Sequence, residues 1–262
     1  MSTTPPTRQN ASENDLHDET WRIDTPEGEL GVRVRRPSTD GPFPVVLMFH
    51  HGPGLDDGTV EAMEIFARAG YFVVCPDRYY REGPWITFNA AELMSGGPDS
   101  EVMGRFFGLL SRTTDEMMAR DAQAVFERVA VDPAARKGKV GCIGYCVGAR
   151  SVIRTMEDHP EVAAGILLHP GQCVVDGPDS PHLRVAALTG NLYIALGAQD
   201  RMSSVEQNQP LIDAASRLGE NARVDIHDGA DHGFAVPGPG YHAAAADRSY
   251  AQALDLLART LG

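Results

Sequence analysis

Apolar residues form two kinds of run along this chain. Short, nearly uninterrupted apolar runs, typical of strands covered on both faces, occupy residues 44–50, 71–75, 139–145, 162–168 and 192–196. Segments with helical apolar spacing lie at 59–69, 115–129, 147–156, 206–218 and 243–261, and a further strand is expected at 223–226. This alternation predicts an α/β fold: a mostly parallel sheet with helices on both faces.

The N-terminal part follows a different pattern. Residues 21–24 and 30–36 alternate apolar with polar side chains around a Pro-Glu-Gly turn, which predicts an antiparallel hairpin at the sheet edge. Residues 1–20 have neither periodicity nor the features of a signal peptide, so we expect a flexible tail, followed by a single domain from 21 to 262. Residues 77–112 lack a clean period and carry six aromatic residues; so long an irregular segment predicts a wall or lid over a pocket.

The amino-acid composition indicates which kinds of ligand or partner the protein is poorly suited to bind. The chain has 23 Lys and Arg residues against 36 Asp and Glu, and the net charge of -13 argues against a nucleic-acid or anionic membrane surface. No apolar run has the length of a membrane span. The four cysteines show no paired metal spacing, which suits reduced thiols. We therefore expect a cytoplasmic protein, monomer or homodimer, that acts on a small molecule.

The run Gly144-Tyr145-Cys146-Val147-Gly148 joins a predicted strand to a predicted helix. Glycines two positions before and after a central residue are typical of a nucleophile elbow, a strained turn that exposes its nucleophile above the sheet. The Cys146 thiol would then lie at the positive end of a helix, where a thiolate is stabilised. A buried structural cysteine fits the same pattern, so the rest of the site has to decide between them.

An acid and a base follow in the order that α/β-hydrolases use. Asp200 comes directly after the strand at 192–196, and His232 lies beside Gly233 in the loop after the last strand. Taken alone, Asp200 fits a helix cap and His232 fits a loop histidine bound to backbone. Their order after Cys146 favours a Cys146–Asp200–His232 triad in which the carboxylate orients the imidazole.

The loop after the strand at 44–50 is expected to complete the active site beside this triad. The backbone amides of Val147 and Gly52 are the predicted oxyanion hole. His50-His51 with a nearby aspartate offers metal ligands, but adjacent strand residues point to opposite faces, so we predict no metal. After the next strand end, Arg81 is the candidate to bind a substrate carboxylate, whereas Arg78 is expected to be a surface charge.

With these motifs in hand, the chain resembles the dienelactone hydrolase family from about residue 20 to its end. The motifs that carry the resemblance are Gly144-Tyr145-Cys146-Val147-Gly148-Ala149-Arg150, Gly197-Ala198-Gln199-Asp200, Asp231-His232-Gly233-Phe234 and Pro76-Asp77-Arg78-Tyr79-Tyr80-Arg81. The resemblance implies an α/β-hydrolase fold without a large cap domain, hydrolysis of a small ester or lactone, and no cofactor. It also implies that Cys146, Asp200 and His232 are catalytic and that Arg81 binds a carboxylate.

Two positions depart from the family's pattern. His51 (or His50, the alignment being ambiguous by one) stands where the prototype has a glutamate that helps to deprotonate the thiol, and we expect His51 to line the substrate site. Val236 stands where the prototype has a second arginine. Other functions compatible with the same residues are an acyltransferase or thioesterase, and a non-catalytic α/β-hydrolase-like protein that binds a ligand. A complete catalytic set in order favours the hydrolase.

Overall fold

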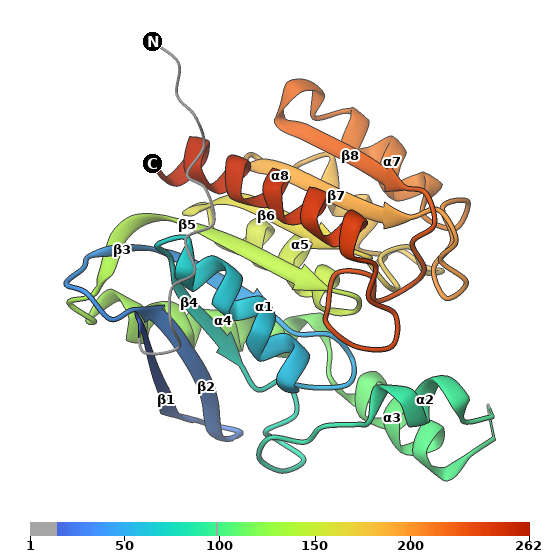
Figure 1. The fold of residues 1–262 in the computed structure, drawn as a ribbon, viewed down its shortest axis with the longest axis horizontal. Helices are drawn as coiled ribbons and strands as arrows, with labels where there is room; N and C mark the ends of the chain where they lie inside the picture. Colours follow the sequence, from blue (N-terminus) through green and yellow to red (C-terminus); the bar gives the residue numbers. More distant parts are fainter. Residues whose placement is uncertain (1–14, 98) are drawn as a thin grey trace.

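A single eight-stranded sheet organises the computed structural model, which describes residues 15–97 and 99–262 (Figure 1). In chain order the strands are β1 (Leu16–Thr25), β2 (Gly28–Pro37), β3 (Phe43–Phe49), β4 (Phe72–Pro76), β5 (Ala135–Tyr145), β6 (Val162–Leu168), β7 (Asn191–Gly197) and β8 (Ala222–His227). Across the sheet they run β1-β2-β4-β3-β5-β6-β7-β8. β2 pairs antiparallel with β1 and β4, and all other pairs are parallel. The predicted mixed sheet with an N-terminal edge hairpin is confirmed.

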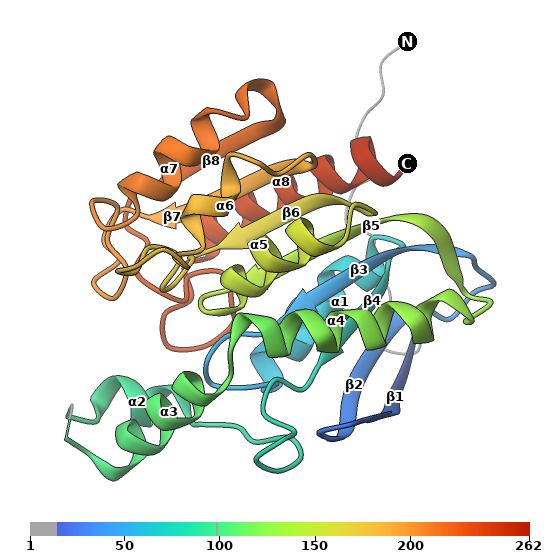
Figure 2. The same cartoon turned by 180° about the vertical axis from the view of Figure 1, so that it is seen from behind.

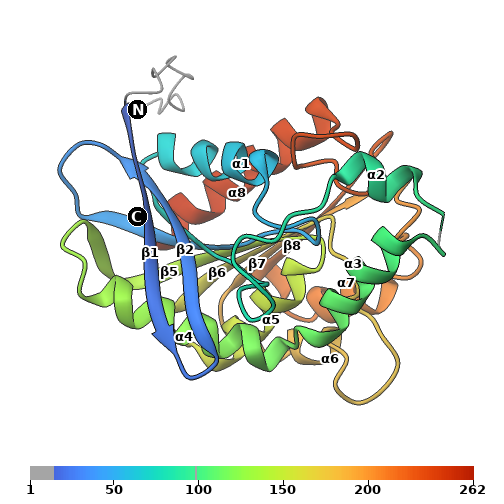
Figure 3. The ribbon, with the colours of Figure 1, turned by 90° about the horizontal axis from the view of Figure 1, so that it is seen from below.

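Helices cover both faces of this sheet. They are α1 (Asp57–Arg68), α2 (Ala90–Ser95), α3 (Glu101–Arg112), α4 (Asp115–Ala130), α5 (Gly148–Asp158), α6 (His182–Val185), α7 (Gln209–Ser216) and α8 (Ala243–Leu261). Figure 3 shows α1 and α8 on one face, with α4, α5 and α6 on the other. None of the helices in the described ranges is long and apolar enough to cross a membrane.

The side chains of β3 show how one strand contributes to both cores. Val45 and Leu47 pack in the core beneath α4 and α5, whereas Val46 and Met48 pack against α1 and α8. Successive strand side chains point to opposite faces, so a strand between two helical layers has to be apolar at every position. The continuous apolar runs of the sequence are the result.

The first strand begins earlier than the sequence predicted. Residues 16–20, expected as part of a tail, pair with Arg33 to Pro37 of β2. Asp18 forms an ion pair with Arg35 at 3.1 Å, so ladder hydrogen bonds and charge pairing hold this polar edge strand. An edge strand held in this way carries no apolar alternation, which is why its signal was missed. Residues 1–14 of the predicted tail lie outside the described residues.

The segment at 77–112 is more regular than predicted. It contains α2 and α3, which extend from one end of the molecule (Figures 1 and 2). Phe88, Phe106 and Leu109 form a small separate cluster with Tyr79. Because α3 buries little more than Phe106 and Leu109, and glycines weaken its helix propensity, its pattern is faint in the sequence.

Candidate active site

The turn between β5 and α5 holds Cys146 in a strained conformation. Its φ is 52°, in the left-handed region that non-glycine residues rarely adopt. Three backbone hydrogen bonds fix the turn: the Cys146 amide donates to Leu168 at 3.1 Å, and its carbonyl accepts from Ala149 at 3.1 Å and Gly171 at 3.0 Å. The strand-to-helix elbow expected from the sequence is therefore present.

The two glycines of the elbow are required by space. A Cβ on Gly144 would collide with the carbonyl oxygen of Gly148, which lies in the first turn of α5. A Cβ on Gly148 would in turn collide with the carbonyl oxygen of Phe49 at the end of β3. These contacts set α5 close to both strands, so that the helix begins directly beside the Cys146 thiol.

Asp200 and His232 meet at the carboxyl edge of the sheet. Asp200 follows β7, His232 lies in the loop after β8, and Nδ1 of His232 is 2.8 Å from Oδ2 of Asp200. The other carboxylate oxygen of Asp200 accepts the backbone N–H groups of Met202 at 2.9 Å and Ser203 at 2.8 Å. The carboxylate is fully buried and fixed, so it sets the orientation of the imidazole.

Cys146 and His232 each shift the pKa of the other. Burial alone would raise the pKa of Cys146, but the His232 charge and hydrogen bonds from His232, Val147 and Gly52 lower it below the ordinary value. Burial alone would lower the pKa of His232, but the Cys146 thiolate and the hydrogen bond to Asp200 raise it. This pairing favours a thiolate beside an imidazolium. The two backbone amides that lower the pKa of Cys146 are those predicted for the oxyanion hole, and that role stays a prediction.

The two adjacent histidines after β3 have separate partners. Nε2 of His51 lies 3.0 Å from Oδ2 of Asp56, whose other oxygen caps α1 by accepting the Thr59 amide at 2.9 Å. His50 is buried and hydrogen-bonds to backbone through both ring nitrogens. No cluster of three potential metal-binding side chains occurs within residues 15–97 and 99–262. Contact between His51 and a substrate stays a prediction.

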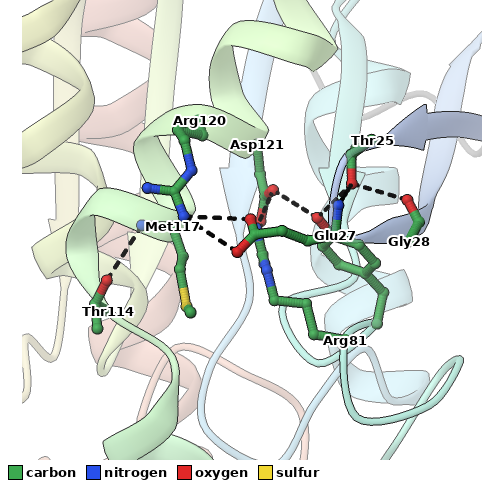
Figure 4. Close-up of polar contacts among 9 residues, drawn as sticks. Thr25, Glu27, Gly28, Arg81, Thr114, Met117, Arg120 and Asp121 are labelled. Carbon is green, nitrogen blue, oxygen red and sulfur yellow. Dashed lines mark hydrogen bonds and ion pairs between the residues drawn. The ribbon is translucent and has the colours of Figure 1, made fainter.

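Arg81, the predicted carboxylate-binding residue, already binds two carboxylates of the chain itself. Its guanidinium binds Asp121 through two hydrogen bonds of 2.9 and 2.8 Å and Glu27 through one of 2.7 Å (Figure 4). It also lies over the ring of Tyr80, 4.4 Å from the centroid. Two carboxylates of the chain itself neutralise this arginine, which ties β1–β2 to α4. The role of Arg81 as a carboxylate-binding residue stays a prediction, and these partners count against it.

Arg78, expected at the surface, is instead a buried cation beside the site. Its side chain donates to Ser151 Oγ at 3.1 Å, and it makes no ion pair with any described residue. Burial lowers the pKa of its guanidinium, and the Cys146 thiolate is among the charges that oppose this. An arginine stays protonated in proteins even so. Arg78 and Val147 line a cavity of about 450 Å³, to which Phe107 and Leu110 of α3 also contribute.

His169 is a second residue that the sequence did not point out. It follows β6, is completely buried, and its ring centroid lies 5.2 Å from that of His232 in an edge-to-face contact. Neither ring nitrogen has a hydrogen-bond partner among the described residues. Burial lowers the pKa of His169 well below the ordinary value, and the charge of His232 acts in the same direction, so this ring is neutral. Its position at a strand end was the available signal.

A mostly parallel sheet with a strained strand-to-helix elbow and a hydrogen-bonded His–Asp pair at its carboxyl edge defines the protein as an α/β-hydrolase. The family model of dienelactone hydrolases matches residues 30–261, and the chain belongs to that family. It is therefore a hydrolase.

Known relatives are distant in sequence and close in fold. Carboxymethylenebutenolidase 1 of Cupriavidus pinatubonensis is 26% identical over 237 residues, 88% of this chain and 92% of that protein. Hydrolase pyvD of Aspergillus violaceofuscus is 26% identical over 174 residues, 66% of this chain and 62% of that protein. The crystal structure of a putative dienelactone hydrolase from Klebsiella pneumoniae has a TM-score of 0.79 at 19% identity, covering 93% and 99% of the two chains.

Gly144→Ala should cost at least about 3 kcal/mol of unfolding free energy or prevent folding, because the new Cβ meets the backbone of α5. Gly104→Ala is the matched control: its Cβ enters open space on α3, where alanine stabilises a helix by about 1 kcal/mol. Urea unfolding of both variants measures the difference. A Gly144→Ala protein within about 0.5 kcal/mol of wild type would contradict this account of the elbow.

Cys146 should react with iodoacetamide at neutral pH much faster than the other three cysteines, whose pKa values burial raises. Because the pKa of Cys146 is lowered, its thiolate persists as the pH falls below the ordinary thiol pKa of about 8.5. In His232→Gln the pKa should rise, and labelling at pH 7 should slow about tenfold or more. Site-resolved mass spectrometry measures each rate, and an unchanged rate in His232→Gln would refute the ion pair.

Proposed function

We propose that this hydrolase cleaves a small ester or lactone with Cys146 as its nucleophile. The observation that carries the proposal is the 2.8 Å hydrogen bond between Nδ1 of His232 and Asp200, which leaves Nε2 without a hydrogen-bond partner among the described residues. His232 also lowers the pKa of Cys146, and Cys146 raises that of His232, so the two groups lie close enough to share a proton. A thiolate held in this way is a competent nucleophile at neutral pH.

In the proposed first half-reaction, the Cys146 sulfur attacks the substrate carbonyl carbon and a C–S bond forms. The carbonyl oxygen becomes an oxyanion that accepts hydrogen bonds from the amides of Val147 and Gly52. When the intermediate collapses, the C–O bond to the leaving group breaks and the departing oxygen takes the proton from Nε2 of His232. A thioester and a neutral imidazole remain.

In the second half-reaction, water attacks the thioester carbonyl while His232 accepts its proton. The C–S bond then breaks, the acid is released, and the thiolate and imidazolium are restored. Asp200 keeps the ring in one tautomer through both steps and stabilises its charge. A cavity of about 450 Å³ beside Val147 suits a small acyl or leaving group.

The same thioester could instead be captured by an alcohol or an amine, which would make the protein an acyltransferase, or a thioester could be the natural substrate. Product analysis with and without added nucleophiles separates these activities from ester hydrolysis. A non-catalytic binding protein is less favoured, because it would have no use for a thiol whose pKa is lowered by a buried imidazolium.

If the substrate carries a carboxylate, we propose that Arg78 rather than Arg81 binds it. Four arginines line the cavity that Val147 also lines, and Arg78 is the one of them without an ion-pair partner among the described residues. His51, oriented by Asp56, is retained as a pocket residue next to Gly52. A guanidinium that lacks a carboxylate partner of its own can form a charge-assisted pair with an anionic substrate.

Cys146→Ala should lower the turnover of short-chain nitrophenyl esters by at least about 10³-fold, because the nucleophile is lost. Stopped-flow release of nitrophenol should show a burst in wild type and none in Cys146→Ala. Cys142→Ala, which removes a buried thiol in the core, serves as the control and should keep near-normal turnover. Equal rates in wild type and Cys146→Ala would exclude Cys146 as the nucleophile.

Arg78→Gln should lower kcat/KM for nitrophenyl hemisuccinate relative to nitrophenyl butyrate by roughly 10- to 100-fold, because only the first ester carries a carboxylate. Arg81→Gln should leave this ratio unchanged and lower Tm, because Asp121 loses its buried partner. The ratio is compared across both variants. A change confined to Arg81→Gln would restore Arg81 as the carboxylate-binding residue.

A further inference from the structure

The peptide that joins His51 to Gly52 carries one of the two proposed oxyanion donors. The Gly52 N–H and the His51 C=O belong to the same planar unit, and in a trans peptide they point in opposite directions. The Gly52 amide is among the backbone groups whose hydrogen bonds lower the pKa of Cys146. The groups that hold the His51 carbonyl therefore also act on the direction of that amide. The position of this oxyanion-hole donor therefore depends on the groups that bind the His51 carbonyl oxygen, on the opposite side of the peptide.

Two donors hold the His51 carbonyl oxygen. Nδ1 of His50 lies 2.7 Å from it, and the backbone N–H of Gly54 lies 3.2 Å from it. The shorter contact comes from a side chain that is only 2% exposed, so water does not compete for this bond. The His50 ring also packs edge-to-face on Tyr79, with centroids 5.8 Å apart, which limits its rotation.

The hydrogen-bond partners of His50 determine which ring nitrogen carries the proton. Nε2 accepts the backbone N–H of Arg78 at 3.1 Å, so it must be unprotonated, and the proton of the neutral ring is on Nδ1. Burial lowers the pKa of His50 to about 3, which keeps the ring neutral across the working pH range. Nδ1 is therefore a permanent donor to the His51 carbonyl.

Glycine at position 52 makes such a clamp necessary. A glycine has no Cβ to restrict its φ, so the 51–52 peptide can rotate at little conformational cost. Rotation would turn the Gly52 N–H away from the sulfur and present the His51 carbonyl to it. A carbonyl dipole at that place would repel both the thiolate and an oxyanion.

We infer that His50 is a positioning residue that locks the 51–52 peptide with its N–H facing the reacting atoms. This inference rests on the proposed function, because it assigns the Gly52 amide to the oxyanion hole. It also explains the tandem histidine: His50 anchors the carbonyl side of the peptide, whereas His51 is bound to Asp56. Through the Arg78 amide, the same ring links the hole to the end of β4.

The test compares two substitutions of nearly equal shape. His50→Asn keeps a side-chain N–H that can reach the His51 carbonyl, whereas His50→Leu has no donor. His50→Phe is added because it retains a ring against Tyr79 if His50→Leu fails to fold. The first readout is the pKa of Cys146, followed by the ultraviolet absorbance of the thiolate against a Cys146→Ala blank. It needs no substrate.

His50→Leu and His50→Phe should raise the pKa of Cys146 by about one unit, because the Gly52 hydrogen bond to the thiolate is lost. They should also lower kcat roughly 10²-fold with little change in KM, as expected for the loss of one oxyanion donor. His50→Asn should retain most of both properties. Rescue by the amide identifies the donor, not the volume of the side chain, as the property that matters.

Tyr79→Phe provides the matched control. The Tyr79 hydroxyl donates to the Gly52 carbonyl at 2.6 Å, so its removal takes one buried hydrogen bond from the same loop but from the following peptide. It should lower Tm and leave the pKa of Cys146 in place. An equal pKa shift in Tyr79→Phe and His50→Leu would mean that general loosening of the loop is responsible, which overturns the inference.

Folded His50→Leu or His50→Phe protein with an unchanged thiolate pKa would also overturn it. This result is distinct from failure of the proposed function. If Cys146→Ala hydrolysed esters as well as wild type, the thiol would not be the catalytic nucleophile. The thiolate pKa of the His50 variants would still report the direction of the Gly52 amide.

Discussion

A partly buried thiolate beside a partly buried imidazolium is the interaction on which this site depends. Removing charged groups from water is costly, and burial by itself shifts the pKa values of Cys146 and His232 towards their neutral forms. The opposing contributions come from the partner charge, two backbone amides and the carboxylate of Asp200. That carboxylate is itself fully buried, and two backbone N–H groups hold it. The hydrogen bonds from Ser203 through Asp200 to Nδ1 of His232 leave Nε2 of that ring, on the side of the thiol, without a hydrogen-bond partner among the described residues.

The order of strands in the sheet explains why these groups can meet. Cys146 leaves β5 near the middle of the sheet, Gly52 arrives from β3 on one side, and His232 and Asp200 arrive from β8 and β7 on the other. Since the strands are parallel, all four loops emerge at the same edge. The Gly52 loop and the base therefore approach the sulfur from opposite sides of β5, and neither has to displace the other.

The sequence predicted the parts of this arrangement that depend on chain order and periodicity. Buried parallel strands are apolar throughout, and the residues just after them, including Cys146 and Asp200, could be identified from that pattern alone. The sequence could not show whether Arg78 or Arg81 is free to bind a substrate, because both follow β4. Only the packed structure reveals that Asp121 and Glu27 bind Arg81. His169 could not be identified from the sequence for a related reason. It contacts the ring of His232, which is 63 positions away in the sequence.

The net charge of this protein and the charge inside its cavity have opposite signs, and they act on different ligands. The overall charge of -13 opposes binding to polyanionic surfaces, but exposed charges are screened over about 8 Å at physiological ionic strength. Arg78 is buried, where screening is weak, and its guanidinium acts on groups within a few ångströms, including Cys146. The three carboxylates that line the cavity are each paired with an arginine, so the charge of Arg78 is left to act on a small anion that enters it. An acidic composition thus argues against nucleic acid as a partner without arguing against an anionic substrate.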